Sequence, residues 1–399
     1  MRGAGWSNAA CSLPTARFPL RLTLRCALLA DSITSTYRSI VARSPHEAFD
    51  LDHLRRRVAR GLMRLLFGKP AEPSGEPLPR RGIHRILVCH ISHTLGNALL
   101  LTPLIRELEA TYPGAQIDIV TRSQVGRELY GHYDRVSDVF QMPAHGFGHP
   151  LQWLRALRGM RKAHYDLAID VDPQSQTGRL LLLKARATWT LGFSGPKKSG
   201  SVTHAVVVPE HVQNKGQRPV YLLRQALGDR AEADYPVPDI RLDEAELARG
   251  RRVLDRVLAT APADARHRKT IGVFANATGP KLLGTGWWNP LLATLEQLRP
   301  DCRLVEIVPM SGRSMLDSRY PSYFSTDLRQ LGAVLANLDG YLSLDCGIMH
   351  LACASRVPTL GIFTTTRADE WGPYGPGNHV IHAYELAPEA VARELAAHL

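Results

Sequence analysis

The chain has 399 residues, more than one hydrophobic core usually serves, so we expect two domains. Hydrophobic residues make up 44% and charged residues 22%, which excludes a largely disordered chain, and no apolar run reaches the about 18 residues of a transmembrane helix. The net charge is +12, and residues 1–80 contribute much of it, with 13 basic and 6 acidic residues. The rest of the chain is nearly balanced in charge, unlike a domain that binds nucleic acid.

A basic arm, residues 1–80, comes first. Its first 40 residues have no acid before Asp31 and fit either a weak targeting segment or an over-extended start. Residues 51–66 place apolar side chains at helical spacing, with arginines off the apolar stripe. This amphipathic helix either lies on an anionic membrane surface or packs on the body as a solvated helix. A Pro-rich linker, Lys69–Pro79, ends the arm.

Strands and helices alternate from Ile83 onward. We predict strands at Arg85–Cys89, Gln116–Val120, Val136–Met142 and Asp166–Val171, and helices through Pro103–Thr111 and Leu151–Ala163. This alternation is typical of a parallel sheet covered on both faces.

A second set of alternating elements follows a connection at Tyr235–Asp239. It comprises a helix at Glu244–Val257 and strands at Thr270–Ala275, Cys302–Val308, Gly340–Leu344 and Pro358–Phe363. The predicted fold class is α/β, with two doubly wound, Rossmann-like domains at 81–240 and 241–399 facing a central cleft. Because ligands of such sheets bind beyond the carboxyl ends of the strands, we expect sites just after Cys89, Val171, Ala275 and Leu344.

The six cysteines show neither CxxC nor zinc-ligand spacing. Cys89 and Cys302 lie in apolar strand-like runs and are expected to be buried thiols. We therefore expect a reducing compartment.

The loop after the first strand, His90–Pro103, is rich in hydroxyl groups and enters a helix. Its free backbone N–H groups suit a phosphate or a sugar oxygen, although an ordinary strand-to-helix turn has the same pattern. It lacks GxGxxG and a following ribose-binding acid, which disfavours an NAD-dependent oxidoreductase.

Two further loops indicate an anion site. Asn276–Trp288 carries three glycines and Lys281, which fit a phosphate as well as a flexible surface loop. In Leu342–Ala354, an acid ends the strand and His350 lies in the first helical turn. The N–H groups of that turn and Gly347 would cradle a diphosphate; alternatively, Asp345 is a simple helix cap.

Together these segments resemble the lipopolysaccharide heptosyltransferases, glycosyltransferase family 9, over about Arg85 to Val380. The matching segments are Leu95–Pro103, Tyr165–Asp170, Asp345–Ala352, Val357–Phe363 and Trp371–Pro376. The resemblance implies a GT-B fold, with 81–240 binding the acceptor and 241–399 binding ADP-heptose. It also implies an inverting, metal-independent transfer, without a cofactor, to a lipid A-linked oligosaccharide. The expected location is cytoplasmic, peripheral on the inner face of the bacterial inner membrane.

The match departs from the family at the proposed base. The family has Gly-Asp where this chain has Gly96 and Asn97, and an amide takes no proton near neutral pH. Asn97 would then only orient the acceptor hydroxyl. Asp172, after the matched Asp170, and His93 are the candidate replacement bases.

The donor half matches better. Lys281, Asp345, Gly347 and His350 stand where the family binds the diphosphate, and Cys346 replaces a small hydroxyl residue. The loop residues Thr94, Gly96 and Thr278 complete the candidate site. Two alternatives stay open. The amide at position 97 fits a nucleotide-sugar-binding pseudoenzyme, and the stretch Met310–Arg313, which lacks the acid that often holds the nucleoside, fits a GT-B transferase using another sugar nucleotide.

Overall fold

The computed structural model describes residues 75–399, except 144–149, 196–197, 199, 232 and 260–267. The targeting segment and the amphipathic helix predicted at 51–66 lie outside the described residues.

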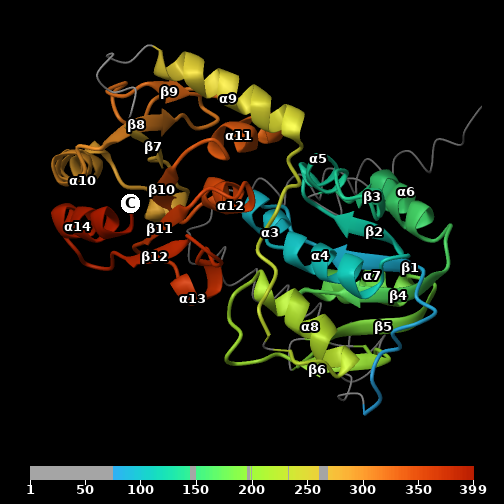
Figure 1. Ribbon diagram of the computed structural model, residues 1–399. Helices are drawn as coiled ribbons and strands as arrows, with labels where there is room; N and C mark the ends of the chain where they lie inside the picture. The colour runs from blue at the N-terminus through green and yellow to red at the C-terminus, as the bar shows by residue number, and fades with distance from the viewer. Residues whose placement is uncertain (1–74, 144–149, 196–197, 199, 232, 260–267) are drawn as a thin grey trace, which may run out of the picture. The chain divides into compact units, whose positions relative to one another are not determined.

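The first six strands form one parallel sheet of order β3-β2-β1-β4-β5-β6 (Figure 1). The strands are β1 (Arg85–His90), β2 (Gln116–Thr121), β3 (Val136–Gln141), β4 (Tyr165–Asp170), β5 (Ala187–Ser194) and β6 (His204–Val207). The helices are α3 (Leu95–Leu99), α4 (Thr102–Thr111), α5 (Gly126–Tyr130), α6 (Pro150–Met160), α7 (Gln176–Lys184) and α8 (Gln217–Leu227). We call this sheet and its helices the N-terminal lobe.

The second sheet is also parallel, of order β12-β11-β10-β7-β8-β9. Its strands are β7 (Lys269–Phe274), β8 (Cys302–Ile307), β9 (Ser322–Tyr323), β10 (Gly340–Leu344), β11 (Thr359–Phe363) and β12 (His379–His382). Its helices are α9 (Glu244–Leu258), the 3₁₀ turn η2 (Gly279–Lys281), α10 (Thr285–Leu298), α11 (Leu328–Leu335), α12 (Gly347–Ala354), α13 (Ala368–Trp371) and α14 (Pro388–His398). We call this the C-terminal lobe.

The two doubly wound sheets confirm the predicted fold class. Every strand and helix predicted within the described residues is present, with ends shifted by at most three residues. Four strands were not predicted: β5, which lies between β4 and β6, and the edge strands β6, β9 and β12. Three of these are only two to four residues long, and β5 contains polar residues and a glycine. Strands of this kind form because neighbouring strands offer them hydrogen bonds, and their own residue pattern contributes less.

Local sequence explains the main elements. Ile86 to Cys89 in β1 are fully buried, because a central parallel strand is covered on both faces. Cys302 is buried as well, so both thiols lie where the sequence predicted. Helix α9 begins with a capping box between Asp243 and Glu246. Among the helices of the described chain, none has the length and apolar character needed to cross a bilayer.

The predicted linker reaches the body before it ends. Leu78 is buried, and its backbone N–H donates to the carbonyl of Ala226 at 2.7 Å. The carbonyl of Pro79 accepts a hydrogen bond from the Tyr112 hydroxyl at 3.0 Å. The apolar side chain of Leu78 thus anchors the last residues of this otherwise polar segment.

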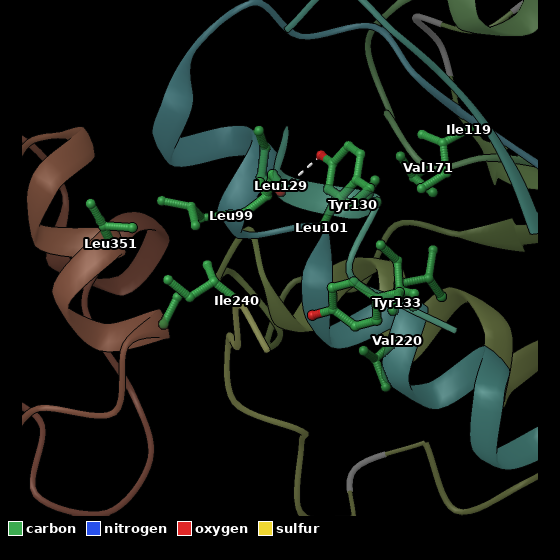
Figure 2. Packing of buried hydrophobic residues seen from close by; sticks show 14 of the residues in the cluster. Leu99, Leu101, Ile119, Leu129, Tyr130, Tyr133, Val171, Val220, Ile240 and Leu351 are labelled. Carbon is green, nitrogen blue, oxygen red and sulfur yellow. Dashed lines mark hydrogen bonds between the residues drawn. The ribbon is translucent and has the colours of Figure 1, made fainter. Parts of the chain in front are cut away.

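One apolar cluster continues from the N-terminal lobe into the C-terminal lobe. Figure 2 shows Leu99 of α3, Ile240 of the connection and Leu351 of α12 within it. Gly332 of α11 lets Ile240 approach, since a Cβ there would lie 2.6 Å from the Ile240 Cδ1. The two lobes therefore pack directly at α3 and α12.

Candidate functional site

The strand orders place two ligand-binding edges next to the lobe contact. Each sheet reverses its strand order at one point: between β1 and β4, and between β7 and β10. Parallel doubly wound sheets bind ligands beyond the carboxyl ends of the strands at such a switch point. The four site positions expected from the sequence, after Cys89, Val171, Ala275 and Leu344, each follow one of these four strands. A cavity lies at each switch point, and we call the two the acceptor-side and the donor-side cavity after the roles that the sequence resemblance implies for the lobes.

The donor-side cavity has a volume of about 480 Å³ and lies beyond β7 and β10. Nine of the predicted site residues line it: Thr94, Gly96, Asn97, Thr278, Lys281, Asp345, Cys346, Gly347 and His350. Residues of α3 thus close a cavity whose other walls belong to the C-terminal lobe.

A buried carboxylate positions the cation of this cavity. The Lys281 Nζ donates to the Asp345 Oδ2 at 3.0 Å, and the Thr366 hydroxyl donates to the same oxygen at 2.8 Å. Asp345 is 6% exposed, so its charge needs such partners. An ammonium has three N–H donors, which leaves two for an anion in the cavity. Both residues were predicted site residues, but no local sequence pattern predicts that they form an ion pair.

His350 lies beneath α3 and is 3% exposed. Burial lowers its pKa to about 4, with the Lys281 charge acting in the same direction and the Asp345 charge opposing it. Its Nε2 is 4.0 Å from the Asp345 Oδ1. The ring is therefore neutral at pH 7 and has one N–H to donate.

Gly96 and α12 meet without space for another atom. A Cβ on Gly96 would lie 2.7 Å from the His350 Cδ2, and one on Gly347 would lie 3.2 Å from the Leu95 Cβ. The first turn of α12 lines the cavity through Gly347 and Ile348, the position that helix N-termini take at a bound phosphate.

The acceptor-side cavity has a volume of about 340 Å³ and lies beyond β1 and β4. His93, Asn97 and Asp172 line it, so all three candidate catalytic residues are brought together. Asn97 and Trp371 line both cavities. The two cavities therefore adjoin each other at these two side chains.

Hydrogen bonds within the loops fix two of these polar side chains. The Asn97 Nδ2 donates to the Ser92 hydroxyl at 2.9 Å. The Asp172 Oδ1 accepts from the backbone N–H groups of Gln174 at 2.7 Å and Ser175 at 3.0 Å. Asp172 is thus an oriented carboxylate at the acceptor-side cavity.

Asp170 has a different position from Asp172. It is fully buried, 2.6 Å from the Lys198 Nζ and 3.2 Å from the Arg179 Nε. Two cations thus neutralise it inside the N-terminal lobe. Asp170 and Asp172 therefore do not direct their carboxylates to one common point, as two carboxylates that bind the same metal ion would. Throughout the described ranges, no three His, Cys, Asp or Glu side chains gather as metal ligands do.

Four further side chains of the acceptor-side cavity were not predicted as site residues: His90, Lys215, Arg218 and Trp371. Lys215 lies 3.1 Å from the Glu370 carboxylate and 5.5 Å from the centre of the Trp371 ring. Lys215 and Arg218 bring two positive charges to this cavity, beside the carboxylate of Asp172. His90 ends β1, Lys215 and Arg218 come from the loop before α8 and from α8 itself, and Trp371 comes from α13. Of the four, only His90 and Trp371 stand in segments that the sequence singled out.

His90 ends β1 at the same cavity. Its Nδ1 is buried and has no hydrogen-bond partner among the described residues. Burial lowers the pKa of His90 to about 4, with the Asp172 charge opposing the shift. His90 is therefore a second neutral imidazole at the site.

Comparison with known proteins agrees with this geometry. Residues 325–397 match the model of glycosyltransferase family 9 (heptosyltransferase). Lipopolysaccharide heptosyltransferase 3 of Escherichia coli is 22% identical over 317 residues, which are 70% of this chain and 83% of that protein.

Solved structures with similar folds include two heptosyltransferases of E. coli. Heptosyltransferase WaaC with ADP has a TM-score of 0.59 at 17% identity, covering 79% of this chain and all of that one. ADP-heptose LPS heptosyltransferase II has a TM-score of 0.60 at 20% identity, covering 79% and 98%. WaaC has also been solved with ADP-2-deoxy-2-fluoro heptose. The chain has the GT-B fold, and its predicted resemblance to the family 9 heptosyltransferases is confirmed.

The lobe contact predicts the effect of a methyl group at Gly96. Gly96→Ala should lower the free energy of unfolding by about 1–3 kcal/mol, because the new Cβ overlaps the His350 ring. A helical glycine replaced without overlap would instead gain about 1 kcal/mol. Gly286→Ala in α10, where no atom lies within 4 Å, is the control. Urea denaturation of both variants measures this difference; equal stabilities would contradict it.

The buried imidazoles predict acid sensitivity. His350 and His90 have pKa values lowered to about 4, whereas an imidazole in the unfolded chain titrates near pH 6.5. The unfolded state therefore binds more protons between about pH 6.5 and 4. Stability is complete above this window and falls as the pH decreases through it, by at most about 1.4 kcal/mol per pH unit for each histidine. Urea denaturation across this window should show a shallower pH dependence for His350→Gln, and an unchanged one would refute the assignment.

Proposed function

We propose that this chain transfers heptose from ADP-heptose to a lipopolysaccharide core acceptor, with inversion and without a metal ion. The observation that supports this most directly is the pair of cavities at the two switch points, which share Asn97 and Trp371. The relatives named above as heptosyltransferases, one of them solved with an ADP-heptose analogue, support heptose and ADP as the donor.

The donor-side cavity would hold the diphosphate. Lys281, fixed by Asp345, supplies positive charge, and the N–H groups of α12 and His350 supply hydrogen bonds. When the bond between the sugar and the diphosphate breaks, the released ADP gains negative charge. Donors that are already in place stabilise that charge without rearrangement.

The acceptor-side cavity would hold the sugar that is attacked. Its hydroxyl oxygen forms the new bond to the anomeric carbon from the face opposite the leaving ADP, which inverts that centre. The hydroxyl proton passes to a base, and Asn97 cannot serve. Asp172 is our candidate base and His93 the alternative. Lys215 and Arg218 make this cavity suitable for an anionic oligosaccharide.

We further propose that the lobes divide these roles, residues 81–240 binding the acceptor and 241–399 the donor. The protein would work in the cytoplasm at the inner membrane, where a lipid-linked acceptor is accessible. The amide at position 97 favours one competing function, a protein that binds nucleotide sugar with little turnover.

Replacing the amide separates these functions. If the natural chain binds nucleotide sugar with little turnover because it lacks a base, Asn97→Asp should raise the transfer rate by about 10²–10⁴. If Asp172 is the base in the natural chain, as we propose, Asp172→Asn should lower the rate by a similar factor and Asn97→Asp should change it little. Asp138→Asn, an exposed carboxylate of β3, is the matched control. Mass spectrometry of the acceptor after incubation with ADP-heptose measures each rate; no transfer by the natural chain or by Asn97→Asp would reject the proposed reaction.

Calorimetric titration tests the donor. The chain should bind ADP-heptose more tightly than UDP- or GDP-sugars. Lys281→Gln should weaken that binding by about 10- to 100-fold, the usual contribution of a charged hydrogen-bond donor. Lys184→Gln, an exposed lysine of α7, should bind like the natural chain. Tight binding of a UDP-sugar alone would replace heptose with another sugar nucleotide.

A further inference from the structure

Helix α6 presents an unusual surface on the N-terminal lobe. Its inner side packs tightly: Ala156 and Met160 are buried, and a Cβ on Gly159 would lie 2.9 Å from the ring of Phe140 in β3. On its outer side, Leu151 is 78% exposed and Leu154 is 47% exposed. The leucines are therefore not needed to hold the helix on the lobe.

The same outer side is cationic. Leu151, Leu154, Arg155 and Arg158 have the spacing i, i+3, i+4 and i+7, so they share one face of the helix. Arg161 and Lys162 follow at its end, and residues 150–164 contain no acid. Within the described residues, none of these four cations forms an ion pair. We call Leu151, Leu154, Arg155, Arg158, Arg161 and Lys162 the α6 surface.

We propose that the α6 surface docks on an anionic lipid membrane. Along the helix, the two leucines precede the two arginines by four residues, which is about 6 Å. A membrane-surface helix buries its apolar side about 5–10 Å deep. With its amino end tilted inward, α6 would place the leucines among acyl chains while the arginines meet lipid phosphates. Unpaired cations next to exposed leucines favour this occupant over a neutral protein surface.

The topology places this surface beside the acceptor. Helix α6 follows β3, so its leucine-bearing amino end lies at the carboxyl edge of the sheet (Figure 1). The acceptor-side cavity opens at the same edge, beyond β1 and β4. Docking through α6 would therefore turn that edge toward the membrane that carries the acceptor. This last step rests on the proposed function, whereas the docking itself does not.

Vesicle binding by the full chain tests the α6 surface. Arg155→Gln/Arg158→Gln should reduce partitioning onto vesicles of phosphatidylethanolamine and phosphatidylglycerol by about fivefold for each arginine. Leu151→Ser/Leu154→Ser should reduce it about tenfold or more. Partitioning of the natural chain should be weaker onto phosphatidylcholine vesicles. The controls are Arg249→Gln/Arg252→Gln on α9 and Leu298→Ser/Leu386→Ser, which also alter exposed side chains.

Kinetics separate docking from catalysis. The α6 variants should keep the natural rate on an acceptor stripped of its acyl chains and lose rate on the same acceptor in vesicles. Natural partitioning by the α6 variants, or equal losses in the controls, would overturn the proposal, as would a changed oligomeric state with unchanged vesicle binding. If the natural chain transfers nothing to the soluble acceptor, the proposed function fails while the vesicle result still decides the docking.

Discussion

The contact between α3 and α12 is the constraint on which the candidate site depends. Gly96 lies against the His350 ring with no space for a Cβ, and the apolar cluster continues past it through Leu99 and Leu351. This approach brings the carboxyl edge of one sheet to that of the other. Without it, each sheet would have its own cavity, and Asn97 would not border both.

The two sides of the site differ in how completely their chemistry is preserved. On the donor side, a buried carboxylate, a lysine and a neutral imidazole lie within one cavity. On the acceptor side, an amide stands where the sequence resemblance implies a carboxylate, and Asp172 lines the same cavity with its orientation fixed by backbone N–H groups. In the proposed reaction, donor binding and proton removal would depend on different residues.

Parallel strands give the N-terminal lobe a single working edge. All strands of its sheet end on the same side, so the acceptor-side cavity and the amino end of α6 share that side although they are separated along the chain. The proposed cavity for a lipid-linked sugar and the proposed surface for the lipid would thus follow from one topology. Leu151 and Leu154 on α6 are exposed, so packing within the lobe does not account for them.

The sequence by itself determined the two sheets, most of their elements and the loops that contain the site. Buried parallel strands are continuous apolar runs, and the family motifs follow them at fixed positions. It also predicted Asn97, Lys281, Asp345 and His350 as candidate site residues.

Only the tertiary structure decided which of these meet. Lys281 and Asp345 are 64 residues apart and pair at 3.0 Å, while Asp170 is withdrawn from the site by Lys198 and Arg179. The sequence likewise did not predict the strands β5, β6, β9 and β12, the position of Trp371 between the two cavities, or the burial of His90. Each depends on contacts between distant segments, and no local pattern of residues encodes such contacts.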